Sequence, residues 1–573
     1  MQFQLDFFKR TDIIRITMNE NAFAMALMKG EVFIVSQTNF NPDIRIERLE
    51  LQNFKGVSDG VIEFNCLKNP IEKDTRSDIL GIYGQNGSGK TTLLEALHVA
   101  KLAMMGRAIP YSTFGSIIAQ GTDSARMSIT FQISNANGTF YHVEYAFSLA
   151  VLVQNASPNA LSNSGDIIKA ATIAGKSGEK FSTTATTLAT LLGAIMIPAA
   201  AIAVEGAVAS YKLKSSGGLK DSLNMFGETK RLAVFDEVLN LSGEFHDSTI
   251  RLGAIIDTRT KDEAFLPKVR QKSFFPNKTA TSMKELQKYK ERLLIKSKSL
   301  IFSDEFIELL FEQDNITEYA QIILDLKAFA IQKIRVLDSK IVGTSEKEVI
   351  PLFTANRGIG IRKSDSTTFL DEEGLQTLQT AIKGINVILC QLIPGLSLEA
   401  VRQVDIDLDD RNEIVHSPGT KVTVYSVRNN VRIPLTEESA GIIRLISSIG
   451  LFSYAFVNPG VTVAIDEIDA GVYEYLLGEL LLIFEEYGSG QLIFTCHNLR
   501  PMEVLDKKYI YFTTTNPKNR YLKPKSIRNE NNLRDVYLRE IISGGQEEDL
   551  YSATKHGKIA SALQKAGEII GQE

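Results

Sequence analysis

The chain is organised around the stretch Gly84-Gln85-Asn86-Gly87-Ser88-Gly89-Lys90-Thr91, which fits the pattern G-x-x-x-x-G-K-[ST] of a phosphate-binding P-loop. The apolar run 78–83 predicts a short buried strand before it, and the run 92–97 predicts a helix after it. The motif requires this strand–loop–helix context. The alternative is a glycine-rich turn that matches by chance, but it leaves unexplained the three further motifs that follow in order.

The residues of the loop suit a nucleoside triphosphate and its metal ion. Glycines let successive backbone N–H groups point toward phosphate oxygens, and the helix start adds the positive end of its dipole. The Lys90 ammonium would reach the β- and γ-phosphates, and the Thr91 hydroxyl would hold Mg²⁺. We therefore expect ATP and Mg²⁺ as cofactors. The expected binding residues of the loop are Gly84, Gln85, Asn86, Gly87, Ser88, Gly89, Lys90, Thr91 and Thr92.

Two apolar runs in the last third of the chain end in polar residues. Residues 460–467 end in Asp466 and Glu467, and residues 491–497 end in His497. Apolar runs without alternation are typical of parallel strands covered on both faces. Asp466 would bind Mg²⁺ opposite Thr91, and Glu467 would polarise the attacking water. His497 would sense the γ-phosphate, the alternative being an ordinary histidine. The predicted catalytic residues are Glu467, Lys90 and His497, and the predicted metal ligands are Thr91 and Asp466.

A short polar stretch, Glu438-Ser439-Ala440-Gly441, precedes a helix predicted over 442–451. A serine hydroxyl and free N–H groups at a helix start form an anion site. Ser439 and Gly441 are therefore further candidates for binding phosphate. The alternative is that Ser439 simply caps the helix.

Composition excludes few classes of function. The 573 residues carry 63 Lys and Arg against 68 Asp and Glu, and the three cysteines are far apart, so a reducing cytoplasm is expected. The N-terminus has acidic residues and no apolar run after a basic region, so we expect no signal peptide. Residues 181–204 carry no charge and could span a bilayer, but their Thr, Ala and Pro content favours a buried segment. We expect no membrane association.

Basic residues concentrate in one part of a stretch predicted to be largely helical, 260–385. Apolar spacing predicts helices over 281–299, 303–311 and 316–337, without sustained heptads, so any arm is short. Lys268 to Lys298 holds ten Lys or Arg against two acids. The interleaved aromatic residues are Phe274, Phe275 and Tyr289. Such a segment could bind nucleic acid by gripping phosphates and stacking bases; the alternative is a solvated helical face.

The order of motifs resembles the ABC-type ATPase heads of the SMC, RecF and OLD group. The shared features are a strand ending Asn53-Phe54-Lys55, the P-loop, a helical insert, the Ser-x-Gly stretch, the Walker B strand and the histidine. The resemblance covers about 44–150 and 230–515. It implies an α/β fold: an ABC-type P-loop head with a mixed sheet, an antiparallel lobe, a helical insertion and a short arm. It also implies a head-to-tail homodimer or higher oligomer, in which Ser439 and Gly441 close over the partner's ATP.

The resemblance suggests a division of the chain into seven parts. We expect an N-terminal extension (1–42), a head lobe with the P-loop (43–150), a low-charge insertion (151–228), antiparallel lobe strands (229–260), a helical insert with the basic patch (261–385), a C-terminal head lobe (386–515) and a C-terminal segment (516–573).

The sequence departs from the pattern of this group at two positions, and these departures point to one branch of it. Ala440 replaces the central glycine of the signature, and Tyr473 stands where transporters and SMC heads have Asp. With the run 531–551, these features look most like the PtuA-type ATPases of Septu and some retron anti-phage systems. That resemblance implies a separate HNH nuclease partner and, in retron versions, a reverse transcriptase and its DNA product.

We expect the protein to be a slow ATPase that acts as the nucleotide-controlled switch or sensor subunit of an anti-phage defence complex. It is not expected to be a nuclease itself. The segment after His497 is too short for an appended metal-dependent nuclease domain of the OLD kind. A RecF-like DNA repair clamp without a toxic partner remains the main alternative. A transporter ATPase is the weakest alternative, because the insert is rich in charge and the Ser-Gly-Gly signature is missing.

Overall fold

The structure is a computed structural model of the chain. It describes residues 2–9, 12–19, 34–35, 43–64, 77–135, 139–154, 229–245, 248–259, 270, 273–275, 288–290, 292–293, 297–311, 316–338, 349–354, 358–362, 367–403, 420–524, 532–543, 548–552 and 555–570. The apolar run 181–204 lies outside these residues.

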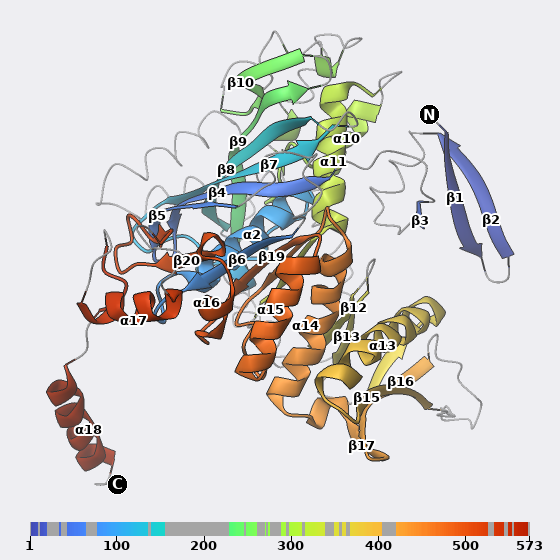
Figure 1. The fold of residues 1–573 in the computed structure, drawn as a ribbon. Helices are drawn as coiled ribbons and strands as arrows, with labels where there is room; N and C mark the ends of the chain where they lie inside the picture. Colours follow the sequence, from blue (N-terminus) through green and yellow to red (C-terminus); the bar gives the residue numbers. More distant parts are fainter. Residues whose placement is uncertain are drawn as a thin grey trace, which may run out of the picture.

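A mostly parallel sheet forms the centre of the molecule (Figure 1). Its strands in spatial order are β11 (Ile334–Leu337), β18 (Thr462–Ile465), β19 (Gln491–Thr495), β6 (Asp78–Tyr83), β20 (Ile510–Thr513) and β21 (Tyr521–Leu522). The first five are parallel, and β21 pairs antiparallel with β20. Strands β6, β18 and β19 are buried along their whole length, which confirms the strands predicted from unbroken apolar runs.

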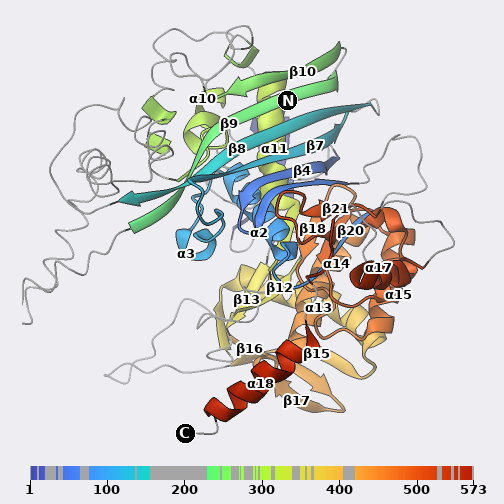
Figure 2. The same ribbon diagram turned by 90° about the vertical axis from the view of Figure 1, so that its left-hand side faces the viewer.

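An antiparallel sheet packs beside the central sheet (Figure 2). Its spatial order is β10 (Ser248–Asp257), β9 (Thr229–Phe245), β8 (Phe140–Gln154), β7 (Ser124–Ser134), β4 (Ile44–Phe54) and β5 (Val57–Glu63). Burial alternates along most of β7, as the sequence predicts for a strand with one covered face. Gln154 pairs with Thr229, so residues 155–228, outside the described part, connect two adjacent antiparallel strands.

Two hydrophobic cores cover the two faces of the central sheet. Leu80 and Ile82 of β6 belong to the core shared with the antiparallel sheet, whereas Ile79 and Tyr83 belong to the other. This alternation follows from the two-residue period of a strand. The first core contains helices α2 (Lys90–Met104), α10 (Asp304–Phe311) and α11 (Glu318–Gln332); the second contains α13 (Glu372–Leu392), α14 (Ala440–Val457) and α15 (Glu474–Tyr487).

The stretch 260–385 is less helical than predicted. Helices α10 and α11 are present, but α11 ends at Gln332 instead of Leu337, and β11 begins two residues later. The segment Ile334-Arg335-Val336-Leu337 pairs with β18, and the sheet overrides its helical apolar spacing. Three further strands follow, β12 (Val349–Phe353), β13 (Gly358–Arg362) and β14 (Thr367–Leu370). The prediction of a largely helical stretch is therefore wrong between Gln332 and Leu370, where the described residues form strands, whereas α13 from Glu372 agrees with it.

The remaining elements are short or peripheral. A small sheet contains β14, β15 (Leu396–Gln403), β16 (Thr420–Arg428) and β17 (Val431–Pro434), and β16 and β17 form a hairpin around Asn429 and Asn430. The N-terminal residues include a separate three-stranded sheet of β1 (Gln2–Lys9), β2 (Asp12–Asn19) and β3 (Ile34–Val35). The other helices are α3 (Tyr111–Phe114), η1 (Leu435–Glu437), α16 (Arg500–Val504), η2 (Lys507–Tyr509), α17 (Leu533–Ser543) and α18 (His556–Ile570).

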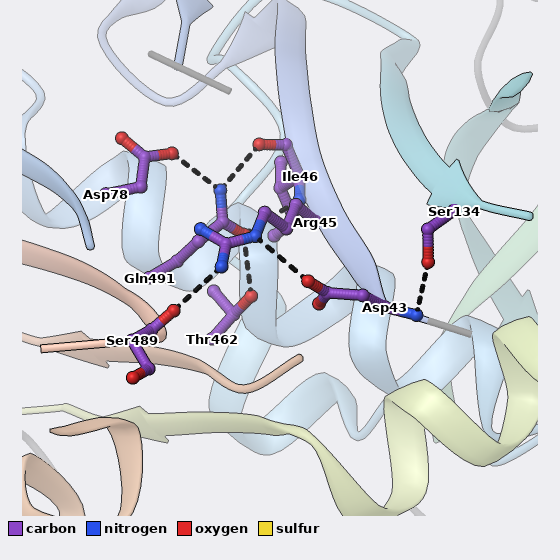
Figure 3. A network of polar contacts seen from close by, with 8 residues as sticks. All are labelled: Asp43, Arg45, Ile46, Asp78, Ser134, Thr462, Ser489 and Gln491. Carbon is purple, nitrogen blue, oxygen red and sulfur yellow. Dashed lines mark hydrogen bonds and ion pairs between the residues drawn. The ribbon is translucent and has the colours of Figure 1, made fainter. Parts of the chain in front are cut away.

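A buried glutamine joins the two large sheets (Figure 3). The Gln491 amide accepts from the Ile46 N–H and donates to the Ile46 carbonyl, both at 2.8 Å, as a strand residue would. It also donates to Asp78 at 2.8 Å and accepts from the Thr462 hydroxyl at 2.9 Å. The antiparallel lobe is therefore fixed to the central sheet by a satisfied polar contact as well as by the core.

Among the described residues, helix α14 is long and apolar enough to cross a membrane, with a mean hydropathy of 1.7 over 18 residues. Half of those residues are buried inside the protein. Ile443, Leu445 and Ile446 pack in the second core, so in this structure α14 is a core helix.

Candidate functional site

The P-loop connects β6 to α2 with the backbone that the motif requires. Gly84, Gly87 and Gly89 have φ values of 156°, 78° and 95°. A Cβ on Gly84 would collide with the Thr513 hydroxyl. Gly89 is the N-cap of α2, and no side chain caps the helix, so N–H groups at the helix start are left for an anion.

Lys90 lies folded over the loop. Its ammonium donates to the carbonyls of Gly84 at 2.7 Å and Gln85 at 3.1 Å. Burial lowers the pKa of Lys90, while the nearby carboxylates of Asp466 and Glu467 act to raise it. The ammonium is thus held at the position where the loop is built to receive phosphate oxygens, and those oxygens can replace the two carbonyls as acceptors.

Thr91 and Asp466 meet at the carboxyl edge of the sheet. The Thr91 hydroxyl lies 3.3 Å from both carboxylate oxygens of Asp466, whose side chain is 1% exposed. Thr495, fully buried at the end of β19, donates its hydroxyl to Asp466 at 2.6 Å. A hydroxyl and a carboxylate beside a phosphate loop are the oxygen ligands that Mg²⁺ prefers, so the chain's own residues fit the ion.

Glu467 is aimed away from the buried Asp466 by a left-handed backbone. Its φ is 49°, its side chain is exposed, and its N–H donates to the Thr495 hydroxyl at 2.7 Å. A non-glycine residue in this region is uncommon and persists only where its surroundings hold it. Thr495, which the sequence analysis missed, therefore positions both acidic residues through a single hydroxyl.

His497 is exposed, and its backbone is tied to the loop after β18. The N–H groups of His497 and Asn498 donate to one carboxylate oxygen of Asp469, at 3.0 and 2.8 Å. Burial raises the pKa of the thiol of Cys496, the residue before His497, and Asp469 adds to that rise. Asp469 thus fixes the turn that carries His497. In sequence, its only signal was a position three residues after Asp466.

Ser439 caps helix α14, as the simpler reading of the sequence allowed. The Ile442 N–H donates to the Ser439 hydroxyl at 3.4 Å. Gly441 approaches Gly471 so closely that a Cβ on Gly441 would lie 2.8 Å from the Gly471 Cα. Within the described part of the chain, no hydrogen bond or ion pair links Ser439 to the P-loop. Tyr473, at the start of α15, is 72% exposed.

The C-terminal residues reach the P-loop, a contact that the sequence did not predict. The Ser552 N–H donates to the Gln85 side chain at 3.1 Å, and the Tyr521 hydroxyl donates to the Gly89 carbonyl at 2.8 Å. Leu550 is buried, and the Thr515 N–H donates to the Asp549 carbonyl at 2.7 Å. The segment 548–552 is therefore bound along one edge of the nucleotide site.

The basic segment Lys268–Lys298 is described only in part, and that part corrects one expectation. Phe274 and Phe275 are buried in the first core and cannot stack bases. Arg270 donates to the Tyr319 hydroxyl, and Lys290 donates to the Thr258 carbonyl, so these two cations contact the protein itself. The predicted helix over 281–299 lies mostly outside the described residues.

Comparison with known protein families assigns the chain to a family. A family model described as "AAA domain" matches residues 48–348, just over half of the 573 residues. The chain therefore belongs to the AAA-domain family of ATPases. With the geometry above, this confirms the predicted fold class, an α/β P-loop ATPase head with an antiparallel lobe. Comparison with curated proteins gave no match.

Comparison with solved structures finds Smc head domains and the recombination mediator protein RecF, all at low identity. The Smc head bound to the C-winged helix domain of ScpA is 13% identical, with a TM-score of 0.33, over 83% of this chain and 98% of that one. The Smc head with a coiled coil and joint from Pyrococcus yayanosii is 12% identical, with a TM-score of 0.32, over 87% and 99%. The recombination mediator RecF with ATP is 11% identical, with a TM-score of 0.29, over 80% and 94%.

Proposed function

We propose that this chain is a Mg²⁺-dependent ATPase whose ATP sites are completed by a second copy of the chain, and that it acts as the nucleotide-controlled switch of a cytoplasmic anti-phage complex with a separate nuclease. The observation that carries the ATPase part is the meeting of Lys90, Thr91 and Asp466 at one sheet edge, with Glu467 next to them. The family match supports it.

Each residue has a distinct task in the proposed reaction. Mg²⁺, when bound, supplies charge neutralisation for the phosphates. Thr91 and Asp466 would hold the ion, and Lys90 would leave the loop carbonyls to bind β- and γ-oxygens. Glu467 would take a proton from the attacking water, since its carboxylate is exposed beside the buried Asp466. His497 would report the presence of the γ-phosphate through the turn that Asp469 holds.

A second copy would complete the site through Ser439 and Gly441. The start of α14 is an anion site by its N–H groups and dipole, and Ser439 is exposed there. It has no described contact with its own P-loop, which supports a role toward another copy. A homodimer is the smallest assembly that uses both surfaces, and higher oligomers can be built from it.

Replacing the proposed base tests hydrolysis. Glu467→Gln should bind ATP normally, hydrolyse it at least about 100-fold more slowly and accumulate as an ATP-bound dimer. Glu474→Gln, an exposed change in the first turn of α15, is the control and should leave turnover unchanged. If Glu467→Gln hydrolyses ATP at the normal rate, Glu467 is not the base.

The defence role rests on sequence features beyond the ATP site. They are Ala440 within the signature, Tyr473 after the Walker B strand, and the run 531–551. Ser552, directly after that run, donates its N–H to the Gln85 side chain of the P-loop, so a partner bound to the run would lie close to the nucleotide. The proposed partner is an HNH nuclease, joined in a retron setting by a reverse transcriptase and its DNA product.

Affinity purification of the tagged chain from its native host tests the defence role. Co-purification of an HNH nuclease, and loss of phage resistance in Lys90→Ala cells, would support it. A homodimer without a nuclease, but with affinity for duplex DNA, would favour the RecF-like clamp. DNA binding through Lys268–Lys298 is a proposal for either case, and among the described residues Lys288 and Arg292 are exposed cations that could take part.

A further inference from the structure

Helix α18 is an amphipathic helix without a partner. None of its 15 residues is buried, and Figure 1 shows it standing apart from the rest of the described chain. Ile559, Leu563 and Ile570 are 44%, 69% and 75% exposed. Their spacing of four and seven residues puts them on one stripe of the helix. A helix of this length is marginal in water alone, so a surface that covers the stripe would stabilise it.

The charges beside this stripe have one sign. Ile569, 63% exposed, widens the apolar stripe on one side, and Lys558 and Lys565, two turns apart, border the stripe there, within about 40° of Ile569 at 100° per residue. Glu568 lies beyond the lysines, at least about 140° around the helix from Ile559, Leu563 and Ile570. A covering surface should therefore be apolar along its middle and acidic along the matching edge, with its acidic groups also about two turns apart.

The exposed face of α15 has these properties. Ile483 and Tyr487 are 43% and 64% exposed on it. Glu479 and Glu486 are exposed beside them and are also seven residues apart, which is about 10.5 Å along the axis on either helix. Tyr475, near the start of the helix, is 55% exposed and already contacts the Arg500 guanidinium, which lies 4.4 Å from its ring centroid. The free part of the face thus centres on Ile483 and Tyr487.

We propose that α18 docks on the exposed face of α15 in a second copy of this chain, with its stripe on Ile483 and Tyr487 and its two lysines against Glu479 and Glu486. In its own chain α18 lies apart from α15 in both views, so the second copy supplies the surface (Figures 1 and 2). Two copies related by a two-fold axis would exchange their helices and satisfy both faces at once. This contact requires no ATP.

The test is a set of charge reversals read by light-scattering mass across a concentration series without nucleotide. Wild type should form dimers. Lys558→Glu with Lys565→Glu should weaken dimerisation by about tenfold or more, because four like charges then face one another, and Glu479→Lys with Glu486→Lys should do the same. The variant carrying all four changes should regain the dimer. Glu568→Lys, on the far side of α18, is the control and should change nothing.

Further measurements distinguish the α18 contact from a dimer contact at the nucleotide site and from a loss of folding. Leu563→Asp should abolish the dimer, and Lys90→Ala should keep it, because the contact is independent of the nucleotide site. Unfolding curves recorded at protein concentrations too low for dimers should be the same for all α18 variants, because α18 buries nothing in its own chain. A monomeric wild type, an unaffected lysine variant or a four-fold variant that stays monomeric would overturn the proposal. So would α18-dependent binding to anionic vesicles without self-association.

Discussion

Replacing Thr495 with valine isolates the hydroxyl that positions both acidic residues of the site. Valine has nearly the same shape, so packing is kept and two hydrogen bonds are lost, at 2.6 Å to Asp466 and at 2.7 Å from the Glu467 N–H. A bond to a charged group is worth about 1.5–3 kcal/mol, and an unpaired buried group costs about 1–3 kcal/mol. Both hydrogen bonds use the same Thr495 oxygen, so their energies are not additive. We therefore expect the free energy of unfolding to fall by about 2–4 kcal/mol.

The kinetic effect of Thr495→Val should appear in kcat. Without the bond to its N–H, Glu467 is no longer held in its left-handed conformation, and a shift of about 1 Å in a catalytic group costs about 100-fold. The KM for ATP should change less than about threefold, since among the described residues no hydrogen bond links Thr495 to Lys90 or to the loop.

Urea unfolding and steady-state ATP hydrolysis measure the two effects, and Thr495→Ser is the matched control. Serine keeps the hydroxyl and loses one buried methyl group, at a cost of about 1 kcal/mol, so its kcat should stay within about threefold of wild type. Normal turnover by Thr495→Val, or equal damage by Thr495→Ser, would refute the positioning role.

Three further predictions concern other parts of the fold. Burial raises the pKa of Asp325 to about 6, so this carboxyl group binds a proton more tightly in the folded protein than in the unfolded chain. The free energy of unfolding should therefore fall as the pH rises from about 4 to about 6. Asp325→Asn should remove that fall and raise the free energy of unfolding by about 1–3 kcal/mol at pH 8, with no gain near pH 4. Gly471→Ala should destabilise the protein and slow ATP turnover, because the φ of 77° at Gly471 and the nearby Gly441 Cα leave no room for a Cβ. Gly384, a helical glycine with open space around it, is the control: Gly384→Ala should stabilise the protein by up to about 1 kcal/mol in thermal unfolding. Gln491→Leu should lower the unfolding free energy by about 3–5 kcal/mol in urea, since both bonds between the Gln491 amide and the Ile46 backbone are lost; a change below about 1 kcal/mol would contradict its role between the sheets.

The central sheet could be predicted because its strands carry strong local patterns. The P-loop glycines, the unbroken apolar runs and the polar residues that end them belong to stretches of a few residues each. Strand β11 could not be predicted in this way. It begins directly after α11, its Ile-Arg-Val-Leu sequence also suits a helix, and only its pairing with β18 decides the outcome. Phe274 and Phe275 likewise looked like part of a basic surface, although tertiary packing buries them.

The sequence predicted the motif residues of the candidate site, but not the residues that hold them in place through hydrogen bonds. Thr91, Asp466 and Glu467 have positions fixed by their motifs. The contributions of Thr495, Asp469 and Ser552 depend on contacts between residues 28 to 467 positions apart in the chain. A buried threonine at a strand end resembles any core threonine until the neighbouring strand is in place. Such residues are found only once the sheet order is known.

The proposal of composite ATP sites is tested most directly by mixing two inactive variants. Lys90→Ala removes the phosphate-binding ammonium. Ser439→Asp keeps a good cap for α14 but puts a negative charge where the partner's phosphate would lie. In a mixed dimer one site has both defects and the other has none, so equal mixing should restore roughly a quarter of wild-type ATP turnover. If the mixture stays inactive, or if Ser439→Asp alone hydrolyses ATP normally, each site is not built from two chains.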